Sequence, residues 1–192
     1  MEPDREMPSY YTRIPNFIVG QGHTIFGSYV YKSLVNGDVA SDIDVRVPEE
    51  KWKELKEQLE STFQCVESNR PSDEYRKRQI RWTYSMNCPN NDPLSSQFYR
   101  GQRIDFTHPQ KNQNYSPDMF KLQYKEVGGK PMIVHSDGDN EKCKKVVSQL
   151  RRREFVPWEG MRYKDKEYFN QPIWTDASTF RYKFKNMFRK DE

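Results

Sequence analysis

The sequence predicts an α+β protein in which helices pack on a mixed β-sheet, and two adjoining segments carry that prediction. Residues 42–47 read Asp-Ile-Asp-Val-Arg-Val, the period of two expected for a strand with one buried face. Residues 48–63 instead carry an apolar stripe at helical spacing, with Lys and Glu between its members. The stripe consists of Trp52, Leu55, Leu59 and Phe63.

The elements before that strand are predicted from glycines and apolar residues. Residues 14–25 alternate apolar residues with glycines, which predicts a first strand ending near Phe26. Gly27 and Ser28 then form a turn. Residues 29–36 follow as a short helix, because Gly37 is a typical C-terminal stop.

The elements after residue 63 follow the same signals. Residues 78–84 and 102–107 are predicted strands, and the Asn-, Pro- and Ser-rich residues 87–96 between them form a loop. Gly128-Gly129-Lys130 lacks the rest of a phosphate-binding loop and is followed by proline, so it predicts a hairpin turn. Residues 139–154 predict a helix, with Asp139 as its cap.

The chain is long enough for one sizeable domain with an appendage. We expect a core over residues 9–136 and a basic, aromatic-rich helical extension over residues 137–192, packed on the core. Residues 180–189 fit either a strand or a helix, and a helix is preferred because Asp176 or Ser178 can cap it. From residue 139 onward the chain has 14 Lys and Arg against 9 Asp and Glu, so the extension carries the basic excess.

Composition narrows the class of protein. An aromatic content of 14% argues against a disordered chain, and the net charge of +4 does not by itself demand a nucleic-acid partner. Cys65, Cys88 and Cys143 have no zinc-ligand spacing, so reduced thiols are expected. No apolar run is long enough to cross a membrane, and the acidic, proline-containing start does not resemble a signal peptide. We therefore expect a soluble, intracellular, cytoplasmic protein with no membrane partner.

The chemistry is concentrated between residues 26 and 47. Gly27 and Ser28 stand at the start of a predicted helix, where free N–H groups attract phosphate oxygens. After 13 further residues, Asp42 and Asp44 occupy alternate positions of a strand, so they point to one face and can hold hard cations. A phosphate cradle beside a divalent-metal site suggests phosphoryl or nucleotidyl transfer.

Asp105 is a candidate for the third carboxylate that such chemistry needs. Two-metal catalysis uses acidic groups that bridge cations about 3.5–4 Å apart and a further acid near the attacking hydroxyl. Asp105 lies between apolar neighbours on a predicted strand. If that strand adjoins residues 42–47, the three carboxylates converge.

These residues resemble the signature of the DNA polymerase β-like nucleotidyltransferase superfamily. The resemblance rests on Phe26-Gly27-Ser28, the spacer, Asp42-Ile43-Asp44-Val45 and Ile104-Asp105-Phe106, and it covers roughly residues 22 to 107. It implies a nucleotidyltransferase-like mixed sheet. Gly27 and Ser28 would contact the nucleotide phosphates, Asp42 and Asp44 would bind two Mg²⁺ ions, which Mn²⁺ can replace, and Asp105 would complete the metal site and assist deprotonation of the acceptor hydroxyl.

The resemblance implies transfer of a nucleoside monophosphate from an NTP, such as ATP, to an acceptor hydroxyl, with release of pyrophosphate. The basic extension favours a nucleic-acid 3′ end as acceptor, with RNA preferred, and Arg151, Arg152 and Arg153 as contacts to its phosphates. A protein or small-molecule acceptor is the alternative within this class. A non-catalytic module on the same fold that binds nucleic acid or nucleotides is the alternative outside it.

Each candidate also has a structural interpretation. Ser28 is a common helix cap, and Asp42 and Asp44 fit a solvated strand face. Lys32 lies one turn after Ser28 and can reach a triphosphate or remain a surface lysine. Arg46 and Arg103 share faces with Asp44 and Asp105, so each can form a salt bridge or meet a phosphate. The remaining candidates, His23, His108 and His135, share no catalytic spacing and are expected to be structural or exposed.

Overall fold

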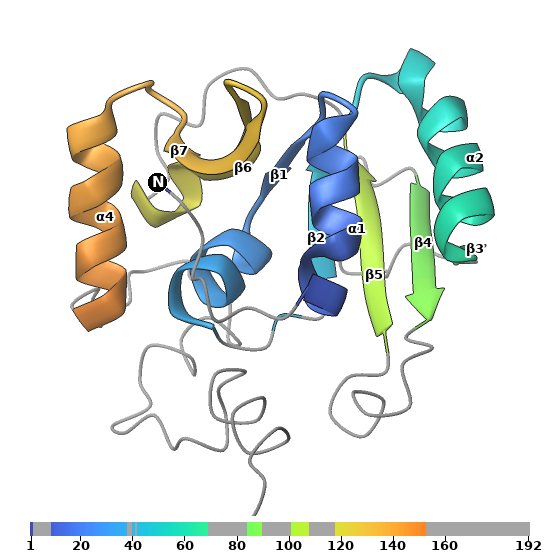
Figure 1. Ribbon diagram of the computed structural model, residues 1–192, viewed down its shortest axis with the longest axis horizontal. Helices are drawn as coiled ribbons and strands as arrows, with labels where there is room; N and C mark the ends of the chain where they lie inside the picture. The colour runs from blue at the N-terminus through green and yellow to red at the C-terminus, as the bar shows by residue number, and fades with distance from the viewer. Residues whose placement is uncertain are drawn as a thin grey trace, which may run out of the picture.

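The computed structural model describes residues 1, 9–37, 40, 42–68, 84–89, 101–107 and 118–152. These residues form a mixed seven-stranded sheet with helices packed on it, in the order β3-β4-β5-β2-β1-β6-β7 (Figure 1). The prediction of an α+β protein with helices packed on a mixed sheet is therefore confirmed. The strands are β1 (Thr24–Phe26), β2 (Asp42–Arg46), β3 (Val66–Glu67), β4 (Tyr84–Pro89), β5 (Gly101–Thr107), β6 (Leu122–Val127) and β7 (Lys130–His135).

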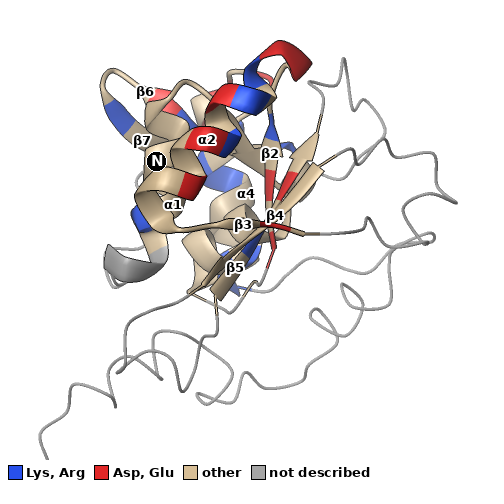
Figure 2. Cartoon of the chain, turned by 90° about the vertical axis from the view of Figure 1, so that its right-hand side faces the viewer, with Lys and Arg blue, Asp and Glu red and all other residues tan. Residues whose placement is uncertain are grey.

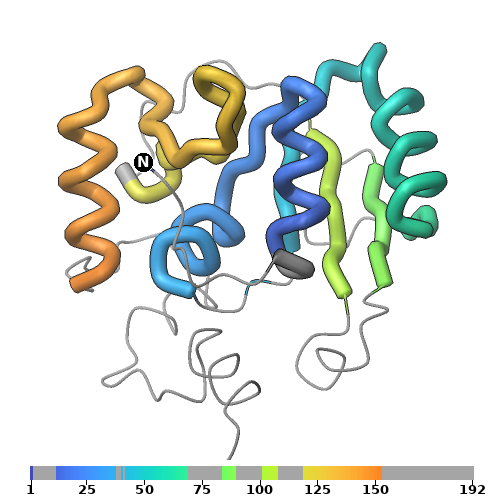
Figure 3. Tube along the Cα trace, viewed as in Figure 1, coloured from blue at the N-terminus to red at the C-terminus, as the bar shows by residue number. Residues whose placement is uncertain are grey.

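One parallel pair lies at the centre of the sheet. Strand β2 runs parallel to β5, although 54 residues separate the two strands in the sequence. Every other pair is antiparallel: β1 with β2 and β6, β4 with β3 and β5, and β6 with β7. The tube in Figure 3 shows how this order brings the early strands of the chain between later ones. The centre of the sheet is therefore the place where β1, β2 and β5 meet.

The main helices are α1 (Ser9–Gly20), α2 (Trp52–Phe63) and α4 (Asn140–Arg152). Figure 2 shows α1 and α2 on the same side of the sheet. Their apolar residues join those of the strands and of α4 in one core; Ile18, Leu55, Leu59, Val147 and Leu150 are completely buried within it. Short helical segments cover Tyr29–Leu34 (η1), Glu49–Lys51 (η2) and Asp118–Lys121 (η3).

The predicted strand over residues 14–25 is wrong for most of its length, because residues 9–20 form α1. Ile14 and Ile18 lie four residues apart and Val19 follows, so these buried side chains share one helix face. Pro15 lies inside the helix, where it removes one backbone donor. Only residues 24–26 form the expected strand before Gly27.

The predictions for the elements on either side of residue 48 are confirmed. Residues 42–46 form a strand with alternating burial, and α2 buries Leu55, Leu59 and Phe63 from the predicted stripe. The indole N–H of Trp52 donates a hydrogen bond to the Val47 carbonyl at 2.8 Å, which ties the helix to the end of β2. The helix therefore packs where the sequence predicts it.

The hairpin and the late helix are also confirmed. Gly128 and Gly129 form the turn between β6 and β7, both with positive φ. An Asp139 carboxylate oxygen accepts hydrogen bonds from the backbone N–H groups of Glu141 at 2.9 Å and Lys142 at 3.2 Å, so it caps α4 as predicted. The predicted helix over residues 180–189 lies outside the described residues.

The structure describes only the last residue of the strand predicted at residues 78–84, and the loop predicted over residues 87–96 is wrong for residues 87–89. Residues 78–83 lie outside the described part of the chain, and β4 occupies residues 84–89, which include part of the predicted loop. Pairing with β5 explains the difference, because Asn87 lies opposite Arg103 and Pro89 opposite Gly101. Tertiary pairing here overrides the turn propensity of Asn and Pro.

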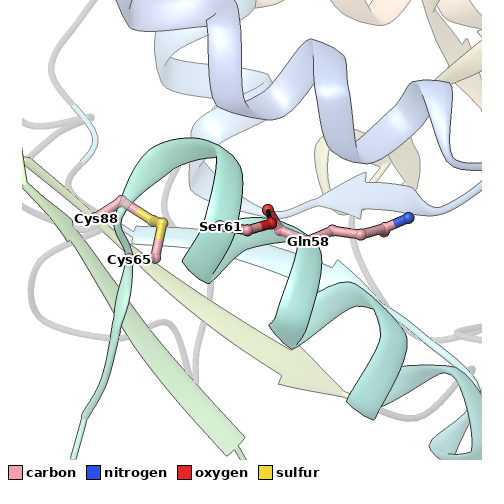
Figure 4. The surroundings of a disulfide bond; sticks show 4 residues. All are labelled: Gln58, Ser61, Cys65 and Cys88. Carbon is pink, nitrogen blue, oxygen red and sulfur yellow. Dashed lines mark hydrogen bonds between the residues drawn. A yellow bond between two sulfur atoms is a disulfide. The ribbon is translucent and has the colours of Figure 1, made fainter.

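The prediction that all three cysteines are reduced is wrong for two of them. Cys65 and Cys88 form a disulfide, which joins the segment after α2 to strand β4 (Figure 4). Gln64 ends α2 in a left-handed conformation, with φ of 56°, and the chain then turns to pair β3 with β4. Cys143 is buried and has a free thiol. The cysteine argument for an intracellular location therefore no longer holds.

Among the helices that the structure describes, none combines the length and the apolar character needed to cross a lipid bilayer.

Candidate functional site

The central strand β2 presents three charged side chains on one face. Ile43 and Val45 are completely buried in the core, whereas Asp42, Asp44 and Arg46 are half-buried. This alternation follows from the pleat of a strand, in which successive side chains point to opposite faces. In Figure 2, the red and blue segments along β2 mark these charged residues. The charged face is thus opposite the one that contributes to the core.

The parallel pairing brings the third predicted carboxylate to the same place. Asp44 lies directly beside Asp105 on β5, and Asp42 lies beside Arg103. Because neighbouring residues in register point to the same face, Asp42, Asp44 and Asp105 share one face of two adjacent strands. The structure thus brings together the three acidic residues proposed from the sequence.

Asp105 is the most deeply placed of these acids, with an exposed fraction of only 2%. One carboxylate oxygen accepts a hydrogen bond from the Ser85 hydroxyl at 2.6 Å and another from Arg103 Nε at 3.0 Å. Arg103 also donates from Nη2 to the Ser85 hydroxyl oxygen at 3.4 Å. The three side chains form a closed network that orients the carboxylate.

Opposing effects act on the protonation of Asp105. Burial raises the pKa of its carboxyl, because the charged form loses hydration. The Ser85 hydrogen bond and the charge of Arg103 lower that pKa, while the negative charge of Asp42 raises it. Burial is the largest of these effects, so the pKa lies above its usual value. A cation between the carboxylates would relieve the repulsion between Asp42 and Asp105.

Gly27 makes room for Asp44. It follows β1 with a φ of +79°, a conformation that favours glycine. A Cβ atom at this position would lie 2.8 Å from Asp44 Oδ2, closer than side-chain contacts allow. The backbone therefore approaches the carboxylate so closely that no side chain fits between them.

The helical segment after Gly27 is unusual. Ser28 precedes η1, whose hydrogen bonds over Tyr29–Leu34 are of the π type, a geometry frequent at functional sites. The Ser28 side chain makes no capping hydrogen bond to this segment, which removes its simple structural interpretation. Lys32 lies on η1 with its ammonium nitrogen 5.8 Å from the ring centre of Tyr31. Its contact with a triphosphate stays a prediction.

Among the described residues, Arg46 forms no salt bridge with Asp44, and its contact with a phosphate stays a prediction. Its guanidinium carbon lies 4.3 Å from the ring centre of Phe26, the residue that pairs with Asp44 across the strands. Arg46 Nε is buried and has no hydrogen-bond partner among the described residues. Burial lowers the pKa of this guanidinium. The acidic face therefore ends in a cation that stacks on an aromatic ring.

The other predicted site residues lie elsewhere. Arg151 Nε donates to the Val35 carbonyl at 3.4 Å, so this arginine ties the end of α4 to the residues after η1. Arg152 is exposed at the end of α4, and Arg153 lies outside the described residues. A contact of these arginines with nucleic acid stays a prediction.

The histidines stay away from the acidic face where they are described. His135 is buried on β7 and accepts a hydrogen bond from the backbone N–H of Asp137 at 3.1 Å, which is a structural role. His23 is half-buried just before β1, and burial lowers its pKa. His108 lies outside the described residues.

The acidic residues share a face of the sheet, but their side chains do not surround a common point. Over the described part of the chain, no three His, Cys, Asp or Glu side chains stand close enough to hold a metal ion as they are. One reason is visible at Asp105, whose Oδ1 is held by Ser85 and Arg103. Carboxylate oxygens are nevertheless the donors that Mg²⁺ prefers, so the residue types suit this ion.

Ser85 is the site residue that sequence analysis missed. Its neighbours Tyr84 and Met86 carry no motif, and the strand prediction ended at residue 84. Only the pairing of Ser85 with Asp105 across β4 and β5 reveals its role. No local signal in the sequence identifies such a partner.

Comparison of this chain with protein-family models, with curated proteins and with solved structures gives no match.

Proposed function

We propose that this protein is a metal-dependent nucleotidyltransferase that transfers a nucleoside monophosphate from an NTP to an acceptor hydroxyl and releases pyrophosphate. The observation that carries the proposal is the register of β2 and β5, which places Asp44 beside Asp105 on the face that also holds Asp42. The close approach of Gly27 to Asp44 supports it, because it joins the predicted phosphate-binding turn to the acidic strand. The resemblance to polymerase β-like nucleotidyltransferases rests on these same residues.

Asp42, Asp44 and Asp105 are the residues that would hold Mg²⁺. When bound, such ions neutralise phosphate charge and make the acceptor hydroxyl easier to ionise. The protein itself contributes position: Ser85 and Arg103 orient Asp105, which can accept the proton of the acceptor hydroxyl. Catalysis would rest on positioning and electrostatics, with no covalent intermediate on the protein.

The phosphates would lie on the β1 side of β2. Gly27 and Ser28 follow β1, and β1 adjoins β2 on the side away from β5. Backbone N–H groups at such a turn are suited to phosphate oxygens, and the absent Cβ lets them approach. We further propose that the acceptor is a nucleic-acid 3′ end, with RNA preferred, since the basic excess lies in the C-terminal residues.

The direct test supplies each NTP, labelled at its α-phosphate, together with Mg²⁺ and pooled RNA and DNA oligonucleotides. We expect label on an oligonucleotide. Replacing Asp44 with Asn keeps the shape but removes the charge, so transfer should fall at least about a hundredfold. Glu126→Gln, a neutralised exposed acid on β6, is the matched control and should retain activity.

The other outcomes are equally informative. Label found on the protein itself would support nucleotidyl transfer but would identify a protein, and not a nucleic acid, as the acceptor. Transfer that persists in Asp42→Ala and Asp44→Ala would exclude these carboxylates as the metal ligands and contradict the proposal. A non-catalytic binding module would tolerate loss of both the acids and Mg²⁺.

A further inference from the structure

A pocket of about 420 Å³ opens next to the acidic face, where β4 ends and β5 begins. Val66, Asn87, Pro89, Gly101 and Arg103 are among its lining residues. Arg103 joins the pocket to the site already described, because its Nε lies 3.0 Å from Asp105 Oδ1. The pocket has no role in the proposed metal and phosphate contacts.

The strand register places most of the pocket's lining residues on the same face as the carboxylates. Asn87 pairs with both Val66 and Arg103, and Pro89 pairs with Gly101. The other two lining residues, Cys88 and Gln102, alternate with these along their strands and are buried. Asn87 and Arg103 are each two positions from Ser85 and Asp105, so they share the acidic face. A molecule that reaches Asp105 therefore lies beside the pocket.

The geometry of the proposed reaction says which substrate lies there. In an in-line displacement, the attacking hydroxyl and the leaving pyrophosphate lie on opposite sides of the reacting phosphorus. The predicted phosphate turn, Gly27 and Ser28, follows β1, on one side of β2, whereas Asp105 lies on the other side. The acceptor must then approach over β5 and β4, which is where the pocket opens.

The lining of the pocket suits a flat, partly apolar group. Val66 is 59% exposed and offers an apolar surface, and Pro89 adds a second one. Arg103 contributes a planar guanidinium, on which aromatic rings stack. The exposed Asn87 amide can both donate and accept hydrogen bonds at the edge of such a ring. A nucleobase combines flat apolar faces with a polar edge.

We propose that this pocket holds the terminal nucleobase of a nucleic-acid acceptor, and so presents its 3′ hydroxyl to Asp105. The inference rests on the proposed function and adds to it the place where the terminal base of the acceptor binds. Arg103 would then contact both the carboxylate of Asp105 and the base. A bound acceptor would thereby be held next to Asp105, which receives the proton of its hydroxyl.

The test compares two fluorescein-labelled RNAs that differ only at the 3′ terminus, one ending in a base and the other in an abasic ribose. Their affinities for the full chain are measured by fluorescence anisotropy in Mg²⁺ without NTP. Stacking of the terminal base strengthens binding, so we expect the base-ended RNA to bind about tenfold more tightly.

Two matched variants locate the effect. Val66→Glu places a charge in the pocket, and Val127→Glu places the same charge at the β6–β7 hairpin, where Val127 is 46% exposed. We expect Val66→Glu to abolish the preference for the base-ended RNA and Val127→Glu to preserve it. Equal affinity of the native protein for both RNAs, or an equal effect of the two variants, would overturn the inference.

The experiment separates this inference from the proposed function. If nucleotides are transferred equally well to base-ended and abasic RNA, the proposed activity is supported. The pocket is then excluded as the binding site of the terminal base. A base preference that Val66→Glu removes, in a protein that transfers no nucleotide, would support the pocket and exclude the activity. Efficient transfer only to a protein or small molecule would exclude the nucleobase as occupant.

Discussion

At the scale of single residues, the site depends on how closely Gly27 approaches Asp44. The sequence motif indicated both residues but not their contact, since pairing between β1 and β2 determines it. Two properties of Gly27 are combined at this position, a positive φ and the absence of a side chain. Another glycine of the chain has the first property alone, which allows the two to be separated.

Gly27→Ala should therefore harm both stability and function. A residue with a side chain is strained at this φ, so we expect a loss of about 1 kcal/mol or more in the free energy of unfolding. The new Cβ should also displace Asp44 and weaken Mg²⁺-dependent NTP binding. Urea denaturation and calorimetric titration measure the two effects.

Gly22→Ala is the control for that experiment. Gly22 has a φ of +90°, but a Cβ there would meet no atom of the described residues within 4 Å. We expect a similar loss of stability with unchanged NTP binding. If the two variants bind NTP equally well, Gly27 does not act through Asp44.

The hydrogen bond from Ser85 to Asp105 should give stability a specific pH dependence. Where the carboxylate is ionised, a hydrogen bond to it contributes about 1.5–3 kcal/mol. Ser85→Ala should cost about that much at pH 7. Well below the ordinary Asp pKa of about 3.9, Asp105 is protonated in the folded and the unfolded protein, so the cost should be smaller.

The sign of this effect follows from the direction of the shift. Burial raises the pKa of Asp105, so its contribution to stability is present at acidic pH and is lost as the pH rises through the folded-state value. Removing Ser85 raises that pKa further and enlarges the loss. Urea unfolding at both pH values tests this, and an equal cost at both would contradict an effect on the ionised carboxylate.

At the scale of elements, the sequence predicted correctly where one signal dominated. Strand β2 and helix α2 have clean periods, and Gly128-Gly129 allows little besides a turn. Helix α1 was misread because Pro15 lies inside it and Gly20 at its end, and both are untypical of a helix. Residues 87–89 were predicted as a loop, but pairing with β5 makes them part of β4. Local signals thus predicted the residues of the acidic face, while long-range pairing determined their partners.

The disulfide ties two of these elements together and should contribute to stability. Cys65 and Cys88 are separated by 23 residues, and closing a loop of this size contributes about 3 kcal/mol by limiting the unfolded chain. Both cysteines are buried. The bond joins the end of α2 to β4, the strand that also carries Ser85.

Reducing agent should therefore lower the urea midpoint of the native protein. The double variant Cys65→Ser, Cys88→Ser should start from a lower midpoint and show no further response. Cys143→Ser is the control, because that thiol is free, and its response to reduction should match that of the native protein. An unchanged midpoint on verified reduction of the native protein would mean that the bond adds no stability.

At the scale of the whole molecule, the fold separates two tasks between the faces of its sheet. One face contributes to the apolar core with α1, α2 and α4, and the other presents the carboxylates, Ser85, Arg103 and the neighbouring pocket. The sequence predicted the acids and their common face. It could not predict the contact of Ser85 with Asp105 or the pocket, because both result from the pairing of β3, β4 and β5.

The most direct test of this account needs no knowledge of the acceptor. A non-hydrolysable NTP analogue is titrated calorimetrically into the native protein and into Asp44→Asn, with Mg²⁺ present and with EDTA in its place. We predict binding that requires Mg²⁺ and that weakens at least about tenfold in the variant, the equivalent of about 1.4 kcal/mol. Binding that is equal with and without Mg²⁺, or equal in the two proteins, would contradict the assignment of the acidic face as a metal-dependent nucleotide site.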